Sequence, residues 1–350
     1  MTTAAHFTLG DQPSARPLFR QDGLRVTLAV LLFSAGIIAA FTASTYGREL
    51  LAEIAIAAIV AMSLDFLAGY GGMVSLGHAG FYGAGAYVYA ALCTKYGVSP
   101  FAAIGSAVAF GGIAGWLIGM ATSRAQGIFF IMATMAFGQM AYAFVFESKY
   151  LGGDDGLTGV PRPNLKALGI NLQDSSHFCC TLVLLAGLVY LLLSRLLASG
   201  FGHALVGVHR NEARMRALGL ATARTKAAAF GIAGAIASLA GTMGACLNGI
   251  ASPEFLHWTV SGEMLLNVIL GGIESLIGPV IGTAVVILMK HVIQGYTDHW
   301  PIFIGCFLIV AVLAGGRGLY GLLADVIAWR PGRQKSASRT DASLTQAPHV

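Results

Sequence analysis

Ten apolar stretches occupy most of this chain, and each is long enough, or nearly long enough, to cross a lipid bilayer. A membrane-spanning helix needs about 20 apolar residues. Only 11% of the 350 residues are charged, whereas soluble domains carry about 25%. The sequence therefore predicts an all-α, polytopic membrane protein with about ten transmembrane or partly re-entrant helices. The stretches are 26–45, 50–69, 79–93, 100–122, 127–147, 179–198, 226–248, 261–273, 277–292 and 301–316.

Lysine and arginine are distributed unequally between the two sides of this predicted bundle. With the N-terminus inside, fifteen of the 21 Lys and Arg residues fall on the cytoplasmic side and six (21 − 15) on the outer side, as the positive-inside rule requires. We therefore expect both termini in the cytoplasm. The expected parts are a cytoplasmic segment at 1–25, a transmembrane domain at 26–322 and a cytoplasmic tail at 323–350. Topology also explains the net charge of +5, so the expected partner is the lipid bilayer and not nucleic acid.

Nothing in the sequence predicts a metal or a cofactor. The five cysteines form no CxxC pair and no other metal-ligand spacing. His78 lies directly before the apolar stretch 79–93, but no second ligand stands at a usable spacing, so we expect it to make a local hydrogen bond. Residues 147–179 form the longest outer loop, which is either a plain surface loop or a platform for a partner.

A polar loop at 200–226 lies between two apolar stretches. Leu205, Val208, Met215 and Leu218 are spaced so that they share one side of a single helix, and Gly219 is a plausible C-cap. Such a helix can lie flat on the membrane, or it can dock into a groove of a soluble partner.

Two apolar segments, 62–86 and 252–282, are interrupted by glycine and proline. Short, interrupted segments in corresponding halves of a membrane protein indicate a transport site. Five predicted spans fall in each half, an odd number, so any internal repeat would be inverted. VSLGHAGF (74–81) and VSGEMLLN (260–267) are candidate counterparts. The predicted helix breaks are Gly71, Gly72, Gly77, Gly271, Gly272 and Pro279.

Carboxylates inside the apolar stretches have two alternative roles. Asp65 and Glu263 each cost roughly 2.5–3.5 kcal/mol to insert without a partner. Each either lines a polar path or caps the free N–H groups of a broken helix. Both roles stay open for Asp65, and lining is favoured for Glu263. The candidate pathway residues are Asp65, Ser75, His78, Glu263 and Asn267.

Six separated blocks resemble the LivM-type permeases of branched-chain amino-acid ABC importers. Within the polar loop, Asn211-Glu212 followed by Ala217-Leu218-Gly219 resembles the loop that couples such a permease to its ATPase. Asp65 departs from the family pattern, where an uncharged amide is more usual, and Arg214-Met215 replaces alanines. The blocks are 67–86, 124–138, 153–163, 211–219, 252–282 and 315–322.

The resemblance implies a bacterial inner-membrane permease subunit that moves branched-chain amino acids, or a small amide such as urea, by alternating access. It also implies two ABC ATPase subunits, a second, related permease and a periplasmic substrate-binding protein. None of the six lysines follows a glycine, so the chain lacks a P-loop and is not expected to be an enzyme.

Two other functions compete with this one. An ion-coupled secondary transporter would also use broken helices, but it would need no ATPase partner. An intramembrane enzyme would need Asp65, Glu263 and His78 to do chemistry, yet the sequence has no HExxH or GxSxG motif.

Overall fold

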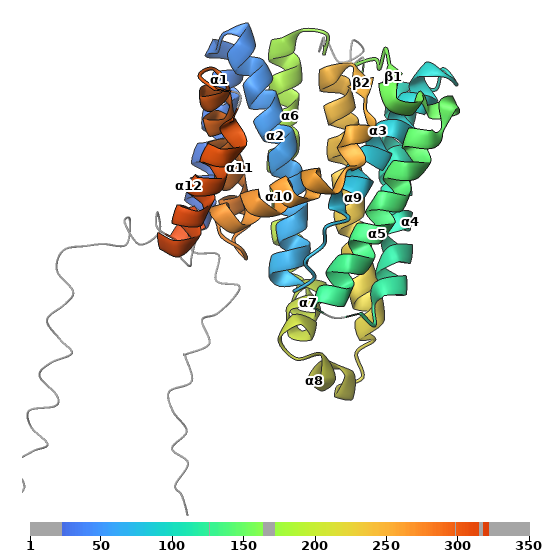
Figure 1. The fold of residues 1–350 in the computed structure, drawn as a ribbon. Coiled ribbons are helices and arrows are strands. Elements are labelled where there is room, and N and C mark those ends of the chain that lie inside the picture. The colour runs from blue at the N-terminus through green and yellow to red at the C-terminus, as the bar shows by residue number, and fades with distance from the viewer. Residues whose placement is uncertain (1–22, 126, 164–171, 298, 315–317, 322–350) are drawn as a thin grey trace, which may run out of the picture.

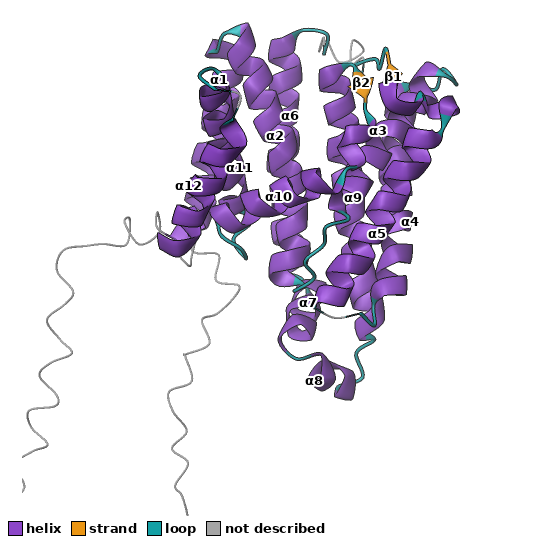
Figure 2. Ribbon diagram, in the orientation of Figure 1, coloured by secondary structure: helices purple, strands orange, loops and turns teal. Residues whose placement is uncertain are grey.

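The computed structural model describes residues 23–125, 127–163, 172–297, 299–314 and 318–321. The predicted tail 323–350 and all but the last three residues of the predicted segment 1–25 lie outside this part. The fold is an all-α bundle with one two-residue pair of strands (Figures 1 and 2). The helices are α1 Gly23–Thr42, α2 Thr45–Asp65, α3 His78–Thr94, α4 Pro100–Thr122, α5 Ile128–Glu147, α6 Ser175–Leu197, α7 Gly200–Arg210, α8 Glu212–Ala217, α9 Thr222–Asn248, α10 Trp258–Gly271, α11 Ile277–Gln294 and α12 Trp300–Ala314.

Each of the ten predicted stretches forms one helix, but not all of these helices are long enough to span a membrane. Within the described residues six are long and apolar enough: α2 with its extension to Tyr70, α4, α5, α6, α9 and α11. The helices α3, α10 and α12 have 17, 14 and 15 residues. Figure 1 shows α10 lying across the middle of the bundle, whereas its neighbours run along the bundle.

Short 3₁₀ turns and the strand pair close one end of the bundle. Strand β1 (Leu157–Thr158) pairs antiparallel with β2 (Ile250–Ala251), so the predicted outer loop is tied to the end of α9. The hydroxyl of Tyr89 donates to the carbonyl of Pro161 at 2.8 Å, which fixes the same loop to α3. The helices α7 and α8 lie at the opposite end (Figure 1). The two ends are called the β1–β2 end and the α7–α8 end below.

Apart from α7 and α8, the helices of the second half follow the same order as those of the first half. They run through the bundle in the opposite direction. The first half is α1, α2, an interruption, α3, α4 and α5; the second is α6, α9, an interruption, α10, α11 and α12. The packing is repeated too: α9 packs against α3 and α4, as α2 packs against α10 and α11. In Figure 1, α2 runs toward the α7–α8 end, whereas α9 runs away from it. These features fit the predicted inverted repeat.

The sequence motifs proposed as counterparts do not coincide in this repeat. VSLGHAGF runs across the start of α3, whose first residue is His78, whereas VSGEMLLN begins two residues inside α10. The pairing of these two motifs is therefore wrong. The break between α2 and α3 corresponds in the repeat to the break between α9 and α10.

Small residues let α4 and α9 pack backbone against backbone. The buried face of α4 has a small residue at every fourth position from Ala103 to Gly119. A Cβ atom on Gly115 would lie 2.7 Å from the carbonyl oxygen of Phe230 in α9, and one on Gly119 would lie 2.8 Å from Cα of Ala227. Where lipid surrounds a bundle, such close approach replaces the hydrophobic effect as the source of helix association.

We expect the substitution Gly115→Ala to lower the melting temperature of the purified protein, because its methyl group overlaps the backbone of α9. Overpacking of this kind costs about 1–3 kcal/mol. Gly105→Ala is the matched control: it lies in the same helix, but a Cβ there meets nothing within 4 Å. The control should keep or raise the melting temperature, since alanine favours helix by about 1 kcal/mol. Equal melting temperatures for Gly115→Ala and wild type would contradict the prediction.

Candidate functional site

The first interruption begins where α2 loosens into a π-helix. This π-helix, η1, spans Phe66–Tyr70 and continues the axis of α2 without a break. The chain is then non-helical through Gly77 and becomes helical again at His78. The predicted breaks Gly71, Gly72 and Gly77 all lie in this stretch. Gly72 has φ +65°, a conformation that a side chain disfavours.

The second interruption separates α10 from α11, and it is distinct from the break between α9 and α10 that takes part in the repeat. Gly271 is the last residue of α10 and Gly272 follows with φ +111°. The next residues include two non-glycines with positive φ, Glu274 at 65° and Leu276 at 55°. Pro279 stands in the first turn of α11, a position where proline fits a helix. Pro279 therefore begins a helix and does not break one.

Asp65 joins these two interruptions. Its side chain is fully buried. Its Oδ1 accepts the N–H of Glu274 at 2.8 Å, and its Oδ2 accepts the N–H of Leu276 at 2.9 Å. The hydroxyl of Tyr70 donates to the carbonyl of Glu274 at 2.7 Å. Asp65 thus caps the irregular loop before α11, which is the second of its two predicted roles, and it does not line the large cavity described below.

Two further predicted pathway residues make hydrogen bonds within the protein. Nε2 of His78 lies 2.8 Å from the hydroxyl of Ser63, the local hydrogen bond expected for this histidine. Ser75 accepts the N–H of Gly77 at 3.2 Å. Both side chains are fully buried, and neither lines the large cavity. The hydroxyl of Ser261 in α10 accepts the N–H of Ala79 at 2.8 Å, so the first turns of α3 and α10 meet.

A cavity of about 900 Å³ lies in the half of the bundle toward the β1–β2 end. Its walls come from the start of α2, the ends of α9 and α11, part of α12, and α10. Two of the predicted pathway residues, Glu263 and Asn267, line it. The other charged or titratable lining residues are Tyr46, Glu49, Glu53, Tyr82, Glu254, Lys290 and His291.

Most of these polar lining residues were not predicted as site residues. On α2 the lining positions are 46, 49, 50, 53, 56, 57 and 60, and on α11 they are 286, 287, 290 and 291. This is a helical spacing. The polar residues among these positions were the signal available; they are Tyr46, Glu49 and Glu53 near the start of α2, and Lys290 and His291 near the end of α11. His291 joins the two helices, because its Nε2 lies 3.1 Å from Oε2 of Glu53 and its Nδ1 lies 3.0 Å from the hydroxyl of Tyr46.

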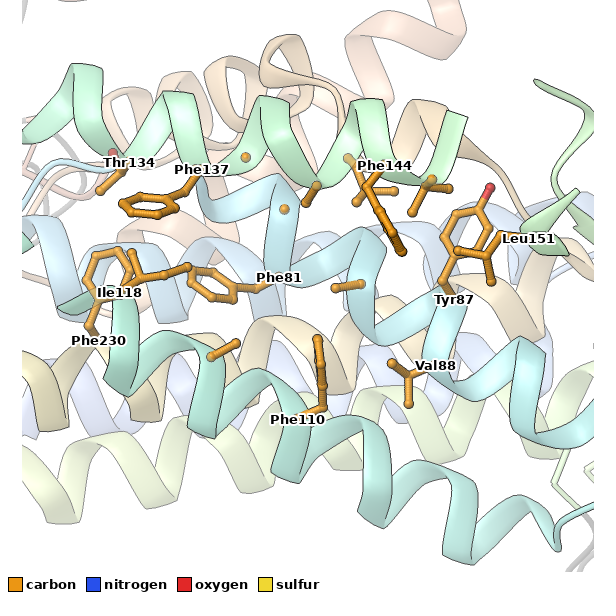
Figure 3. Close-up of a pocket in the computed structure, with 18 of the residues that line it drawn as sticks. Phe81, Tyr87, Val88, Phe110, Ile118, Thr134, Phe137, Phe144, Leu151 and Phe230 are labelled. Atoms are coloured by element: carbon orange, nitrogen blue, oxygen red, sulfur yellow. The ribbon is translucent and has the colours of Figure 1, made fainter. Parts of the chain in front are cut away.

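A second cavity, of about 300 Å³, lies between α3, α4 and α5. Figure 3 shows aromatic and aliphatic side chains surrounding it, among them Phe81, Phe110 and Phe137. Its lining contains hardly any polar groups, with Thr134 and Tyr87 as the hydroxyl-bearing residues. Such a surface offers nothing to a charged or strongly polar solute, so we place the candidate transport site in the larger cavity.

The polar loop forms two short helices, and the prediction of a single amphipathic helix is wrong. Asn211 separates them, with φ −158° and ψ 91°, and its Oδ1 accepts the N–H of Arg214 at 2.9 Å. Leu205 and Val208 are buried against the bundle, whereas Leu218 is 73% exposed. Gly219, with φ +84°, follows the last turn of α8 as the expected C-cap. Asparagine is a strong N-cap, and this signal was available in the sequence.

Glu212 faces the protein interior instead of solvent. Its carboxylate lies 2.6 Å from Nζ of Lys226 and 2.8 Å from the guanidinium of Arg216, and it accepts the hydroxyl of Thr222 at 3.1 Å. Burial raises the pKa of this carboxyl, but the hydrogen bond and charge of Lys226, with Thr222 and Arg216, bring the pKa below its usual value. Glu212 therefore ties α8 to the start of α9.

Helix α7 packs directly against the first interruption. A methyl group on Gly72 would overlap the imidazole ring of His209, and one on Gly71 would lie 3.5 Å from Cδ1 of Leu205. The loop at the α7–α8 end is thus in contact with the glycines that break the first segment. Sequence spacing gave no sign of this contact.

Within the described ranges, no group of three or more His, Cys, Asp or Glu residues could hold a metal ion. The five cysteines are unpaired thiols.

Comparison with known proteins gives one family. Residues 48–313 match the model of the family described as branched-chain amino acid transport system / permease component. The high-affinity branched-chain amino acid transport system permease protein LivM of Salmonella typhimurium is 26% identical over 299 residues, which is 79% of this chain and 70% of the relative. LivM of Escherichia coli has the same identity and coverage. No solved structure matches the chain significantly.

We expect Asp65→Ala to destabilise the protein strongly, because the substitution leaves the buried N–H group of Leu276 and the partly buried N–H group of Glu274 without an acceptor. Each such group costs about 1–3 kcal/mol. Asp65→Asn should cost less, since its single carbonyl oxygen still accepts one of the two bonds. Melting temperatures measured in detergent test this order. Glu49→Ala, an acidic residue of the same helix that lines the cavity, is the control and should change the melting temperature little. If Asp65→Ala were as stable as this control, the capping role would be wrong.

Proposed function

Because this chain belongs to the family of permease components of branched-chain amino acid transport systems, we propose that it forms the membrane path of an ATP-driven importer. It is a multi-pass membrane protein and a permease subunit of an ABC importer. The proposed cargo is a branched-chain amino acid or a related small amide, and the proposed mechanism is alternating access.

The proposed assembly contains two ABC ATPase subunits, a second, related permease and a periplasmic substrate-binding protein. In this assembly the α7–α8 end and both termini face the cytoplasm of a bacterium, and the β1–β2 end faces the periplasm. The position of basic residues supports this orientation. Arg124, Arg195 and Arg224 lie in or near connections at the α7–α8 end, where lysine and arginine are in excess. ATP hydrolysis belongs to the partner subunits.

One observation carries the proposal: the α7–α8 loop, the first interruption and the second interruption form a continuous chain of contacts. The ring of His209 lies directly against Gly72, and Leu205 lies close to Gly71. The π-helix leads from these glycines back to Asp65, which binds the loop before α11. Single-turn π-helices occur frequently at functional sites. A displacement of α7 by an ATPase would therefore reach α10 without crossing a flexible linker.

The exposed surface of α8 fits a docking helix. Leu218 projects from the loop with 73% of its surface exposed, and the exposed side chains of Arg214 and Arg216 lie beside it. An apolar pocket with an acidic rim is the complementary surface. In this proposal Asn211 and Gly219 set the two ends of α8, and Glu212 holds α8 against α9, so these residues position the docking surface.

We expect Leu218→Glu to weaken binding of the ATPase subunits by at least about tenfold, because truncating an apolar anchor at an interface centre typically costs 2 kcal/mol or more. A pull-down with the tagged permease measures this. Tyr296→Glu is the control, since Tyr296 is 88% exposed in the loop between α11 and α12, at the opposite end. Undiminished recovery of ATPase subunits with Leu218→Glu would refute docking at α8.

A second experiment tests the transmission of motion. Gly72→Ala should reduce ATP-driven uptake in proteoliposomes about tenfold, the size of an ordinary coupling energy, while the ATPase subunits still bind. Gly97→Ala is matched to it, because Gly97 has φ +62° but open space around its Cα, and this control should transport normally. The double substitution Gly72→Ala with His209→Ala removes the overlap and should recover part of the uptake.

Two results would count against this mechanism. Equal uptake by Gly72→Ala and wild type would show that the contact with α7 carries no motion. Uptake that continues without ATP or without the ATPase subunits would favour the ion-coupled secondary transporter.

A further inference from the structure

Helix α10 carries two hydrogen-bond acceptors beside the large cavity that no described residue satisfies. Glu263 is exposed and lines the cavity, and its carboxylate makes no hydrogen bond or ion pair within the described part of the chain. Asn267 is only 7% exposed, and its Oδ1 is buried without a partner. An unsatisfied buried amide oxygen costs about 1–3 kcal/mol, so a native structure that keeps one gives reason to look for a ligand.

These two acceptors lie on the same side of α10. Residues four apart on a helix are neighbours on its surface, with Cβ atoms about 5–6 Å apart, and both line the one cavity. A solute in the cavity therefore contacts the exposed carboxylate of Glu263, and it reaches Oδ1 of Asn267 when that side chain turns toward the cavity.

The chemistry of the pair favours a cation with several N–H donors. A carboxylate accepts hydrogen bonds and donates none, and Oδ1 of an asparagine is likewise an acceptor. An ammonium group supplies three donors and a positive charge, which makes charge-assisted hydrogen bonds about twice as strong as neutral ones. We propose that Glu263 and Asn267 bind the protonated amino group of the transported substrate. This inference rests on the proposed transport function and narrows it.

The other charges of the cavity favour the same class of ligand. Glu49, Glu53 and Glu254 add three carboxylates to its lining, against Lys290 and His291, and His291 is already engaged by Glu53. A cavity lined mainly by one sign of charge concentrates ligands of the opposite sign. An amino acid with its ammonium group fits this lining, whereas urea has no positive charge and a simple carboxylic acid is repelled.

Binding of L-leucine to the purified full-length protein in nanodiscs at pH 7, followed by calorimetry, tests the proposal. Glu263→Gln should weaken binding about ten- to hundredfold, the range expected for one charged hydrogen bond. Asn267→Leu should also weaken it, about tenfold. Glu263→Asp keeps a carboxylate and should stay within a few-fold of wild type. Glu49→Gln removes one negative charge from the same cavity and should also have an effect of only a few-fold.

A matched ligand separates recognition of the amino group from recognition of the hydrocarbon chain. 4-Methylpentanoic acid is leucine without its amino group, so wild type should bind it at least about tenfold more weakly than leucine. Glu263→Gln should reduce this preference. The proposal is overturned if Glu263→Gln binds leucine as tightly as wild type, if Glu49→Gln has the same effect as Glu263→Gln, or if wild type binds no leucine.

These outcomes are independent of the test of ATP-driven transport. If wild type takes up leucine with ATP but Glu263→Gln binds and transports it equally well, only the ammonium site is wrong. If leucine binds through Glu263 but uptake needs no ATPase, the proposed importer function is wrong and the ammonium site stands.

Discussion

The carboxylate of Asp65 holds together the two places where helices of this bundle are interrupted. It accepts the N–H groups of Glu274 and Leu276, which lie in a loop that two positive φ angles keep from being helical. At membrane depth no lipid can replace such bonds, so irregular backbone is tolerated only where protein or trapped water satisfies it. The end of α2 and the start of α11 are therefore fixed to each other. The same contact fixes the end of α10, because α10 runs directly into this loop in the chain.

The same constraint separates structural polar residues from those available to a ligand. Ser63, Ser75 and Ser261 bond to His78 or to backbone N–H groups near the start of α3. Their hydrogen-bonding capacity is used where the first interruption ends and α3 begins. Glu263 and Asn267 lie on a regular helix, which needs no side chain to satisfy its backbone, and they face a cavity. A polar residue in an apolar segment is thus a candidate for binding when the backbone around it is already satisfied.

The sequence predicted what depends on local patterns. All ten apolar stretches form helices, and the glycines from Gly71 to Gly77 and at Gly271 and Gly272 mark the interruptions. It did not predict contacts between distant segments. The partners of Asp65 are 209 and 211 residues away, and nothing local shows that α10 crosses the bundle. In the polar loop, the spacing of the apolar residues predicts one helix with Leu218 and Leu205 on the same face. The N-cap signal of Asn211 indicates a second helix, and in the structure Leu205 is buried whereas Leu218 is exposed.

In the proposed mechanism α10 both binds the substrate and stands across its route. The loop that Asp65 caps continues directly from Gly271, the last residue of α10, while Glu263 and Asn267 belong to the same rigid helix. A shift of that loop, driven from α7 through Gly72 and the π-helix, would move the barrier and the two acceptors together. The opening of the route and the loss of affinity would then be one event. Since coupling between two binding sites is reciprocal, a substrate held by α10 must also change the affinity of α8 for its ATPase, which would let the importer hydrolyse ATP preferentially when the cavity is loaded.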